Sequence, residues 1–141
     1  MQVDRGSISQ GQLIPLVFGQ DALAASQSDV QLPVAIGEGS QAVDGYTMPF
    51  DYAIVAISGD LSAAATAGSL TIGATKNGTE VAASTRTITT QTTFRKSFPR
   101  NLIRGKAGDR LGIEITTSGT WDGTAADLAA VLWVILMVDR I

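Results

Sequence analysis

The sequence contains no cysteine and no histidine, and their absence removes several kinds of chemistry. Without cysteine there are no disulfides and no thiolate metal sites. Without histidine the chain lacks the commonest general base, the commonest metal ligand and the usual charge switch near neutral pH. The acids are scattered singly, so we expect no enzyme, no metal and no cofactor. A glycosidase-type carboxylate pair, Glu114 with Asp109 or Asp127, stays open as an alternative.

Charge is also scarce, since 16% of the 141 residues are charged and the formal net charge is −3. Neither value is typical of a nucleic-acid-binding or disordered chain. The N-terminus, Met1–Ser7, lacks the basic and apolar regions of a secretory signal. The longest apolar run, Leu128–Val138, is shorter than the roughly 20 residues that a membrane-spanning helix needs. We therefore expect a single domain that binds neither nucleic acid nor membrane.

The run Leu128–Val138 reads as a final strand that is apolar on both faces. Leu132 and Val134 lie on one face, and Trp133 and Ile135 lie on the other. A strand with one face on a core and the other in water should alternate apolar and polar residues. Both faces should therefore be buried, one against the core and one against another copy of the chain. The pattern does not say which face is which.

A second segment, Tyr52–Ser58, has the same two-faced apolar pattern. We therefore group it with the final strand as part of a sheet that faces the core on one side and a subunit axis on the other. The candidate residues of this oligomer interface are Tyr52, Ile54, Leu132, Trp133, Val134 and Ile135.

Other segments alternate cleanly between apolar and polar residues, among them 69–75 and 110–117. Turn-forming clusters separate them, and we count about eight strands and no long helix. This spacing indicates an all-β fold, an antiparallel sandwich or barrel. We divide the chain into residues 1–45, an N-terminal arm with a first edge strand, and residues 46–141, the sandwich.

Two loop features carry specific expectations. Asn77-Gly78 lies between two strand patterns and predicts a hairpin with a type I′ turn, because both central residues of that turn need positive φ. With Thr79 it also forms a glycosylation sequon, but the turn is the preferred interpretation. Trp121 lies in the polar loop Ser118–Thr124, where it either packs back on the sandwich or offers an exposed contact for sugar or protein.

The segment Leu13–Phe18 is apolar but is interrupted by Pro15, which has no N–H for a strand ladder. It is therefore an edge strand or an extended arm, and its side chains need cover from the body or from a neighbour. The candidate docking residues of this segment are Leu13, Ile14, Leu16 and Phe18.

Six of the ten basic residues gather between positions 95 and 110, where Asp109 is the only acid. This region is either a solvated loop or a docking face for an acidic partner surface. Nucleic acid fits less well, because only Phe94 and Phe98 are available there for stacking. The candidate docking residues of this region are Arg95, Lys96, Arg100 and Arg104.

From Met48 to Val138 the pattern resembles the small jelly-roll proteins of tailed-bacteriophage virions, which include capsid decoration (cement) proteins and head-fibre or tail-fibre modules. The layout is similar to the trimeric jelly rolls of the C1q and tumour-necrosis-factor heads. The features that carry the resemblance are Tyr52–Ser58, Leu61–Leu70, Asn77-Gly78-Thr79, Ala107–Leu111, and Ala125–Leu128 leading into the final strand.

The resemblance implies a jelly-roll β-sandwich without active-site residues that assembles as a homotrimer. Its implied role is capsid decoration: it binds the major capsid protein on the outer surface of the phage head and stabilises the head. The alternative is a tail- or head-fibre receptor-binding module that recognises host surface glycans through loops such as Ser118–Thr124. A third possibility is a bacterial sugar-binding or C1q-like module.

Overall fold

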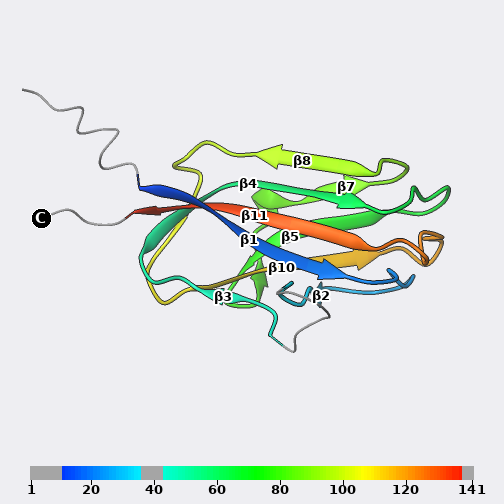
Figure 1. The fold of residues 1–141 in the computed structure, drawn as a ribbon, viewed down its shortest axis with the longest axis horizontal. Coiled ribbons are helices and arrows are strands. Elements are labelled where there is room, and N and C mark those ends of the chain that lie inside the picture. The colour runs from blue at the N-terminus through cyan, green and yellow to red at the C-terminus, as the bar shows by residue number, and fades with distance from the viewer. Residues whose placement is uncertain (1–10, 36–42, 138–141) are drawn as a thin grey trace, which may run out of the picture.

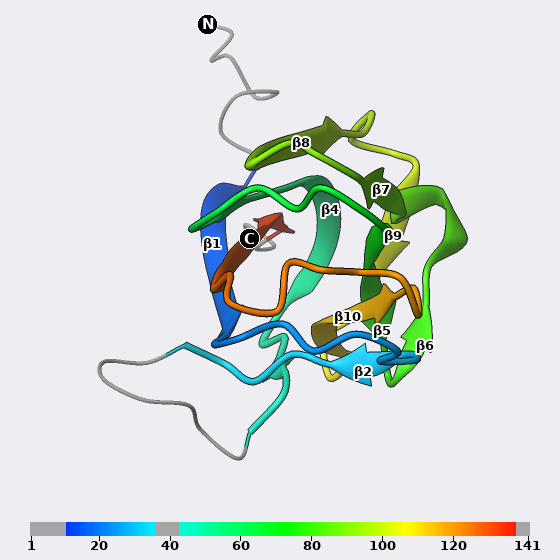
Figure 2. The ribbon, with the colours of Figure 1, turned by 90° about the vertical axis from the view of Figure 1, so that its right-hand side faces the viewer.

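The computed structural model describes residues 11–35 and 43–137, and these residues fold mainly as β-strands. The strands form two antiparallel sheets that face each other, so the expected all-β sandwich is confirmed (Figures 1 and 2). The single helical element in this part of the chain is the short 3-10 turn η1, Ala82–Ser84. Across the same residues, no helix is both long and apolar enough to cross a membrane.

The first sheet, sheet A, contains both the first and the last strand of the chain. Its order is β1-β11-β4-β8, and β9 also pairs with β4 (Figure 1). Its strands are β1 (Gln12–Gln20), β4 (Asp51–Leu61), β8 (Thr93–Ser97), β9 (Ile103–Gly105) and β11 (Leu128–Met137).

The second sheet, sheet B, is built around β10 and β5. Its order is β2-β10-β5-β6, with β3 paired to β10 and β7 paired to β5. Its strands are β2 (Val30–Gln31), β3 (Tyr46–Thr47), β5 (Leu70–Lys76), β6 (Thr79–Glu80), β7 (Arg86–Ile88) and β10 (Arg110–Thr117).

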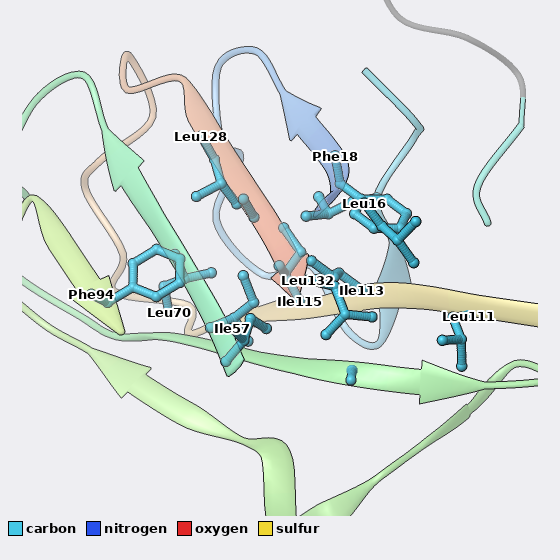
Figure 3. Packing of buried hydrophobic residues seen from close by; sticks show 14 of the residues in the cluster. Leu16, Phe18, Ile57, Leu70, Phe94, Leu111, Ile113, Ile115, Leu128 and Leu132 are labelled. Carbon is cyan, nitrogen blue, oxygen red and sulfur yellow. The ribbon is translucent and has the colours of Figure 1, made fainter. Parts of the chain in front are cut away.

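The core lies between the sheets. Alternate residues of each strand point to opposite faces, so each sheet contributes every second side chain. Leu132 of β11 and Ile57 of β4 come from sheet A, while Ile113 and Ile115 of β10 come from sheet B (Figure 3). All four side chains are completely buried. Burial of each contributes roughly 1.5–3 kcal/mol.

Strand β4 changes its phase in the middle. The pairing with β11 shifts at this point, because Trp133 is opposite Ala56 but Val134 is opposite Ile54, which leaves Val55 as an extra residue. Such a β-bulge exchanges the faces on which alternate residues lie. Even-numbered Ile54 and odd-numbered Ile57 therefore both point into the core. The two-faced apolar pattern of Tyr52–Ser58 thus reflects this bulge.

The Asn77-Gly78 turn confirms its prediction. Thr75 pairs with Glu80 and Lys76 with Thr79, so the two residues between them close a hairpin. Asn77 has φ 53° and Gly78 has φ 84°, as a type I′ turn requires.

Strand β1 is an edge strand that pairs along its whole length with β11, from Gln12 opposite Leu136 to Gln20 opposite Leu128. Of the two interpretations of this segment, the edge strand is the one observed, and residues 12–20 are part of the sandwich. Residues 1–10 of the expected arm lie outside the described residues.

Candidate functional site

The structure identifies which face of β11 points into the core. Leu132 and Val134 are completely buried, whereas Trp133 and Ile135 lie on the opposite, outer face and are partly exposed. The Trp133 indole N–H donates a hydrogen bond to Ser58 Oγ at 2.9 Å, which fixes the ring against β4. Trp133 and Ile135 are therefore the positions of β11 that a second subunit can reach.

Four of the six candidate interface residues need correction. Tyr52, Ile54, Leu132 and Val134 each have 0% exposure within a single chain. They pack between the two sheets, so no surface of them is left for another subunit. The sequence placed Tyr52 and Ile54 at an interface because the bulge in β4 was not visible in the pattern.

The outer side of sheet A carries a continuous group of apolar side chains from three neighbouring strands. The strand register places Leu13 opposite Ile135, Pro15 opposite Trp133, and Val17 opposite Val131. We call this group the outer face of sheet A. It consists of Leu13, Pro15, Val17, Val55, Ala56, Val131, Trp133 and Ile135.

The four candidate docking residues of β1 divide between the core and the surface. Leu13 is 55% exposed and belongs to the outer face of sheet A. Ile14 is partly buried and packs against the core. Leu16 and Phe18 are buried, and the Phe18 ring meets Tyr46 edge-on at 5.4 Å. Their assignment to a docking surface is corrected, because they alternate with the outward residues and point between the sheets.

The basic residues of positions 95–110 do not gather on one surface. Arg95 and Lys96 pair with Ser58 and Ile57 near one end of β4, whereas Arg104 pairs with Ala53. Four or five strand residues separate the two groups, which corresponds to roughly 15 Å. Arg100 lies between them in the β8–β9 connection.

Several of these cations already have contacts. Arg110 forms an ion pair with Asp44 at 2.8 Å. The Lys96 ammonium donates to the Thr85 carbonyl oxygen at 2.9 Å, and Arg104 Nη2 donates to the Met137 sulfur at 3.4 Å. The charged stretch is thus a set of separate sites, each with its own surroundings.

One of these sites is a hollow of about 620 Å³ at the β8 side of sheet A. We call it the basic hollow. Its lining residues are Ala56, Ile57, Ser58, Arg86, Arg95, Lys96, Ser97 and Trp133. Sequence reasoning missed Arg86, which lies in a threonine-rich segment and reaches the hollow from β7 of sheet B. No local signal in the sequence connects it to Arg95.

A second hollow, a cleft of about 480 Å³, lies where β1 ends and β11 begins. Its apolar lining includes Val17 and Ala129, and three carboxylates, Asp21, Asp60 and Asp127, lie around it. Asp127 Oδ1 accepts a hydrogen bond from the Ala22 backbone N–H at 2.9 Å, so part of its role is to hold the loop after β1.

The loop 118–124 is fixed to the end of the sandwich. Trp121 is only 2% exposed, and its indole N–H donates to the Leu23 carbonyl oxygen at 3.2 Å. The next residue, Asp122, accepts hydrogen bonds from the backbone N–H groups of Thr66 and Ala67 at 2.8 and 3.1 Å. The hydrogen bond from the Thr66 hydroxyl is the main reason that the pKa of Asp122 is lowered. Of the two expectations for Trp121, packing back on the sandwich is the one observed.

Asp109 has a structural environment. It accepts hydrogen bonds from the Tyr52 hydroxyl at 2.9 Å and from the Lys106 backbone N–H at 3.1 Å. The bond from Lys106 is the main cause of the lowered pKa of Asp109. Burial, followed by the bond to Asp109, raises the pKa of the Tyr52 hydroxyl. These contacts tie the turn before β10 to β4.

Glu114 is the one charged residue buried within the described part of the chain, at 5% exposure. Burial raises its pKa to about 7, helped by a hydrogen bond with Asp29 and by the charge of Glu80. Neither Asp109 nor Asp127 contributes to this shift. Among residues 11–35 and 43–137, no group of acids could hold a metal ion.

No protein family matches the sequence, and no curated protein matches it. Among solved structures, the fold is similar to a chain described as the cyanophage Pam1 capsid asymmetric unit, with 10% sequence identity and a TM-score of 0.45. The match covers 90% of this chain and 86% of that chain. A likeness of this size carries no argument about function.

Proposed function

We propose that the protein is a non-enzymatic structural protein of a tailed-bacteriophage virion. In this role it decorates the outer surface of the assembled head as a homotrimer, contacts the major capsid protein and stabilises the head. Stabilisation follows from mass action, because a protein that binds only the assembled lattice lowers the free energy of that lattice.

The outer face of sheet A is the observation that carries this proposal. A sheet with its outer side in water should present polar residues there. Here Val131, Trp133 and Ile135 stand in a row on the central strand β11, flanked by Pro15 and Val17 on β1. A contiguous apolar patch of this kind is typical of a protein–protein contact. We assign it to the contact between subunits.

The strand order supports the jelly-roll part of the proposal. The chain alternates between the sheets, so that sheet A has the order β1-β11-β4-β8 while β2, β10, β5 and β7 run side by side in sheet B. The first and last strands, β1 and β11, are neighbours in sheet A, and the second and second-last strands, β2 and β10, are neighbours in sheet B. Two such Greek keys wrapped together define a jelly roll.

In the proposed trimer, groups that remain exposed outside the subunit contact bind the capsid. In this proposal the basic residues of β8, β9 and their connection each contact acidic groups of the capsid protein. The receptor-binding alternative lacks such support. Its clearest sugar-stacking candidate, Trp121, is buried and hydrogen-bonded to the chain itself.

The test combines a mass measurement with particle binding. The purified protein should sediment at three times its chain mass of 14.6 kDa. Added to heads that lack it, the protein should bind in many copies per particle, visible by electron cryomicroscopy on the outer surface. It should also raise the temperature at which the heads break. A monomer in solution would contradict the trimer, and absence from the head, with binding to host cells, would favour the receptor-binding module.

A further inference from the structure

The basic hollow is unusual in its charge. Three cationic side chains, Arg86, Arg95 and Lys96, line it together with the hydroxyls of Ser58 and Ser97. No carboxylate and no amide side chain is among its lining residues. A site made of cations and hydroxyls is suited to an oxyanion, because guanidinium groups bind carboxylates through paired hydrogen bonds.

The two arginines of the hollow are unengaged within the described part of the chain. No ion pair or side-chain hydrogen bond joins Arg86 or Arg95 to residues 11–35 or 43–137, whereas Arg110 has its own partner in Asp44. Lys96 is held in place by the Thr85 carbonyl oxygen. The hollow therefore presents positive charge that residues 11–35 and 43–137 do not neutralise.

The strand beside the hollow, β8, is an open edge. It is the last strand in the order β1-β11-β4-β8, and within the described residues it has hydrogen-bonded strand pairing only with β4. Its position is fixed, because Phe94 and the following Phe98 are buried in the core. An open edge with a fixed strand is a template for the addition of an extended segment from another chain.

The opposite edge of sheet A is closed in comparison. Gly19 N–H donates to the Pro33 carbonyl oxygen at 3.1 Å, and Ala35 N–H donates to the Val17 carbonyl oxygen at 3.0 Å. Pro15 removes a further ladder donor from β1. Sheet A can thus be extended more readily at β8 than at β1.

We propose that β8 and the basic hollow together bind an extended acidic segment of a partner protein. The segment adds to the edge of β8 as a strand, and its carboxylates, at every second position, reach Arg86 and Arg95. Alternate residues of an added strand point to one side of the sheet, so an alternating acidic pattern brings one row of carboxylates to the hollow. The identity of the partner as a component of the phage head rests on the proposed function.

A protein segment fits the hollow better than an acidic sugar. Sugar hydroxyls are usually bound by carboxylate or amide side chains in addition to hydrogen-bond donors. The lining of the hollow contains no carboxylate and no amide side chain. The indole of Trp133 is only partly exposed, and its N–H is already bonded to Ser58. The open strand edge, by contrast, is useful only to a peptide backbone.

The test uses the full-length protein and a short synthetic peptide of alternating threonine and glutamate, with binding measured by calorimetry at low salt. The double variant Arg86→Gln/Arg95→Gln should bind this peptide at least about tenfold more weakly. The matched control Lys106→Gln/Arg110→Gln removes the same charge outside the hollow and should change the affinity less than about twofold. Melting temperatures verify that both variants are folded.

Three comparison ligands make the proposal falsifiable. The glutamine version of the peptide should not bind, and a version with proline at every second threonine should bind weakly, because proline cannot donate to the strand ladder. An oligosaccharide of glucuronic acid should bind more weakly than the acidic peptide. Equal losses in both double variants, unimpaired binding of the proline peptide, or preference for the oligosaccharide would each overturn the proposal.

Particle binding separates this inference from the proposed function. If the wild-type protein binds the acidic peptide but not phage heads, the site stands and the decoration role fails. If the Arg86→Gln/Arg95→Gln variant loses the peptide but still decorates heads at full occupancy, decoration stands, and the partner of the hollow is not the head.

Discussion

The outer sides of the two sheets differ in the polarity of their residues and in how far the chain covers them. On sheet B the outward residues are small or polar, and Gly73, Thr75, Gly112 and Glu114 are all buried. Other parts of the chain cover them: a Cβ added to Gly73 would lie 3.1 Å from Glu80 Oε2. On sheet A the outward residues of β11 and the first half of β1 are apolar, and no described segment folds across the row on β11.

In the proposed trimer, this difference means that the chain covers the outer side of sheet B itself, while a second subunit covers that of sheet A. Polar outward groups can be satisfied by short loops, because each hydrogen bond needs only one matching atom. Apolar outward groups are stabilised in proportion to the surface area that is removed from water, and a loop of a small domain does not cover enough of it. We therefore expect variants on the two outer sides, and on the two faces of β11, to behave differently.

The largest effect is expected on the core side of β11. Leu132→Asp places a carboxylate in a completely buried position, which should destabilise the fold by more than about 4 kcal/mol and leave the chain unfolded. Leu132→Met keeps the volume and should cost less than about 1.5 kcal/mol. Circular dichroism during thermal unfolding distinguishes these outcomes, and a folded Leu132→Asp protein would contradict the assignment of this face to the core.

On the other face of the same strand, Trp133→Asp should leave a folded protein that no longer forms the proposed trimer. Trp133 is partly exposed, so the loss of intrinsic strand stability is about 1 kcal/mol, while a charge at the subunit contact is much less tolerated. Sedimentation measures the mass. The control Thr87→Asp, exposed on sheet B, should retain the wild-type mass. If both variants keep it, sheet A does not mediate assembly.

The pH dependence of stability tests whether Glu114 is buried on the covered outer side of sheet B. Its pKa in the folded protein is about 7, compared with 4.5 ordinarily, so the folded state holds more protons between these values. The contribution of Glu114 to stability should therefore be full below about pH 4.5 and should fall by on the order of 2 kcal/mol as pH rises through 7. Glu114→Gln should flatten this slope in urea titrations.

The smallest effect is expected at the hairpin that leads the chain over sheet B. Gly78 has φ 84°, and no atom lies within 4 Å of the position that a Cβ would take. Gly78→Ala should therefore act through backbone strain alone and lower the stability by about 1 kcal/mol, measured by denaturant unfolding. The mass in solution should not change. A shift in mass would mean that the hairpin takes part in assembly.

Strand β11 was predictable and β4 was not, for a physical reason. In β11 the alternation of buried and partly exposed residues is unbroken from Leu128 to Ile135, so its two apolar faces are real. In β4 the extra residue Val55 shifts the alternation of core-facing and outward residues. A strict period of two therefore places Tyr52 and Ile54 on the outer side, although both face the core. A bulge depends on the pairing with a neighbour, which a single strand does not encode.

The same limit applies to the candidate sites. The Asn77-Gly78 turn was predictable because its signal is local. The basic hollow was only half predictable: Arg95 and Lys96 stood out as part of a charged stretch, but Arg86 joins them only through the approach of β7 and β8 from different sheets. The density of basic residues in the sequence therefore indicated the region of the site, but only the strand topology shows which residues line it.

The pairing of Gln12 with Leu136 has a practical consequence for engineering. The first and last strands are antiparallel neighbours, so these two positions lie about 5 Å apart, at the same pole of the sandwich (Figure 1). A short glycine-serine linker between them, with new ends opened at Asn77-Gly78, would give a circular permutant that keeps every strand pairing. Cargo fused to the permuted ends would still leave from this pole, because Asn77 and Tyr52, which pairs with Leu136, both hydrogen-bond to Asp109.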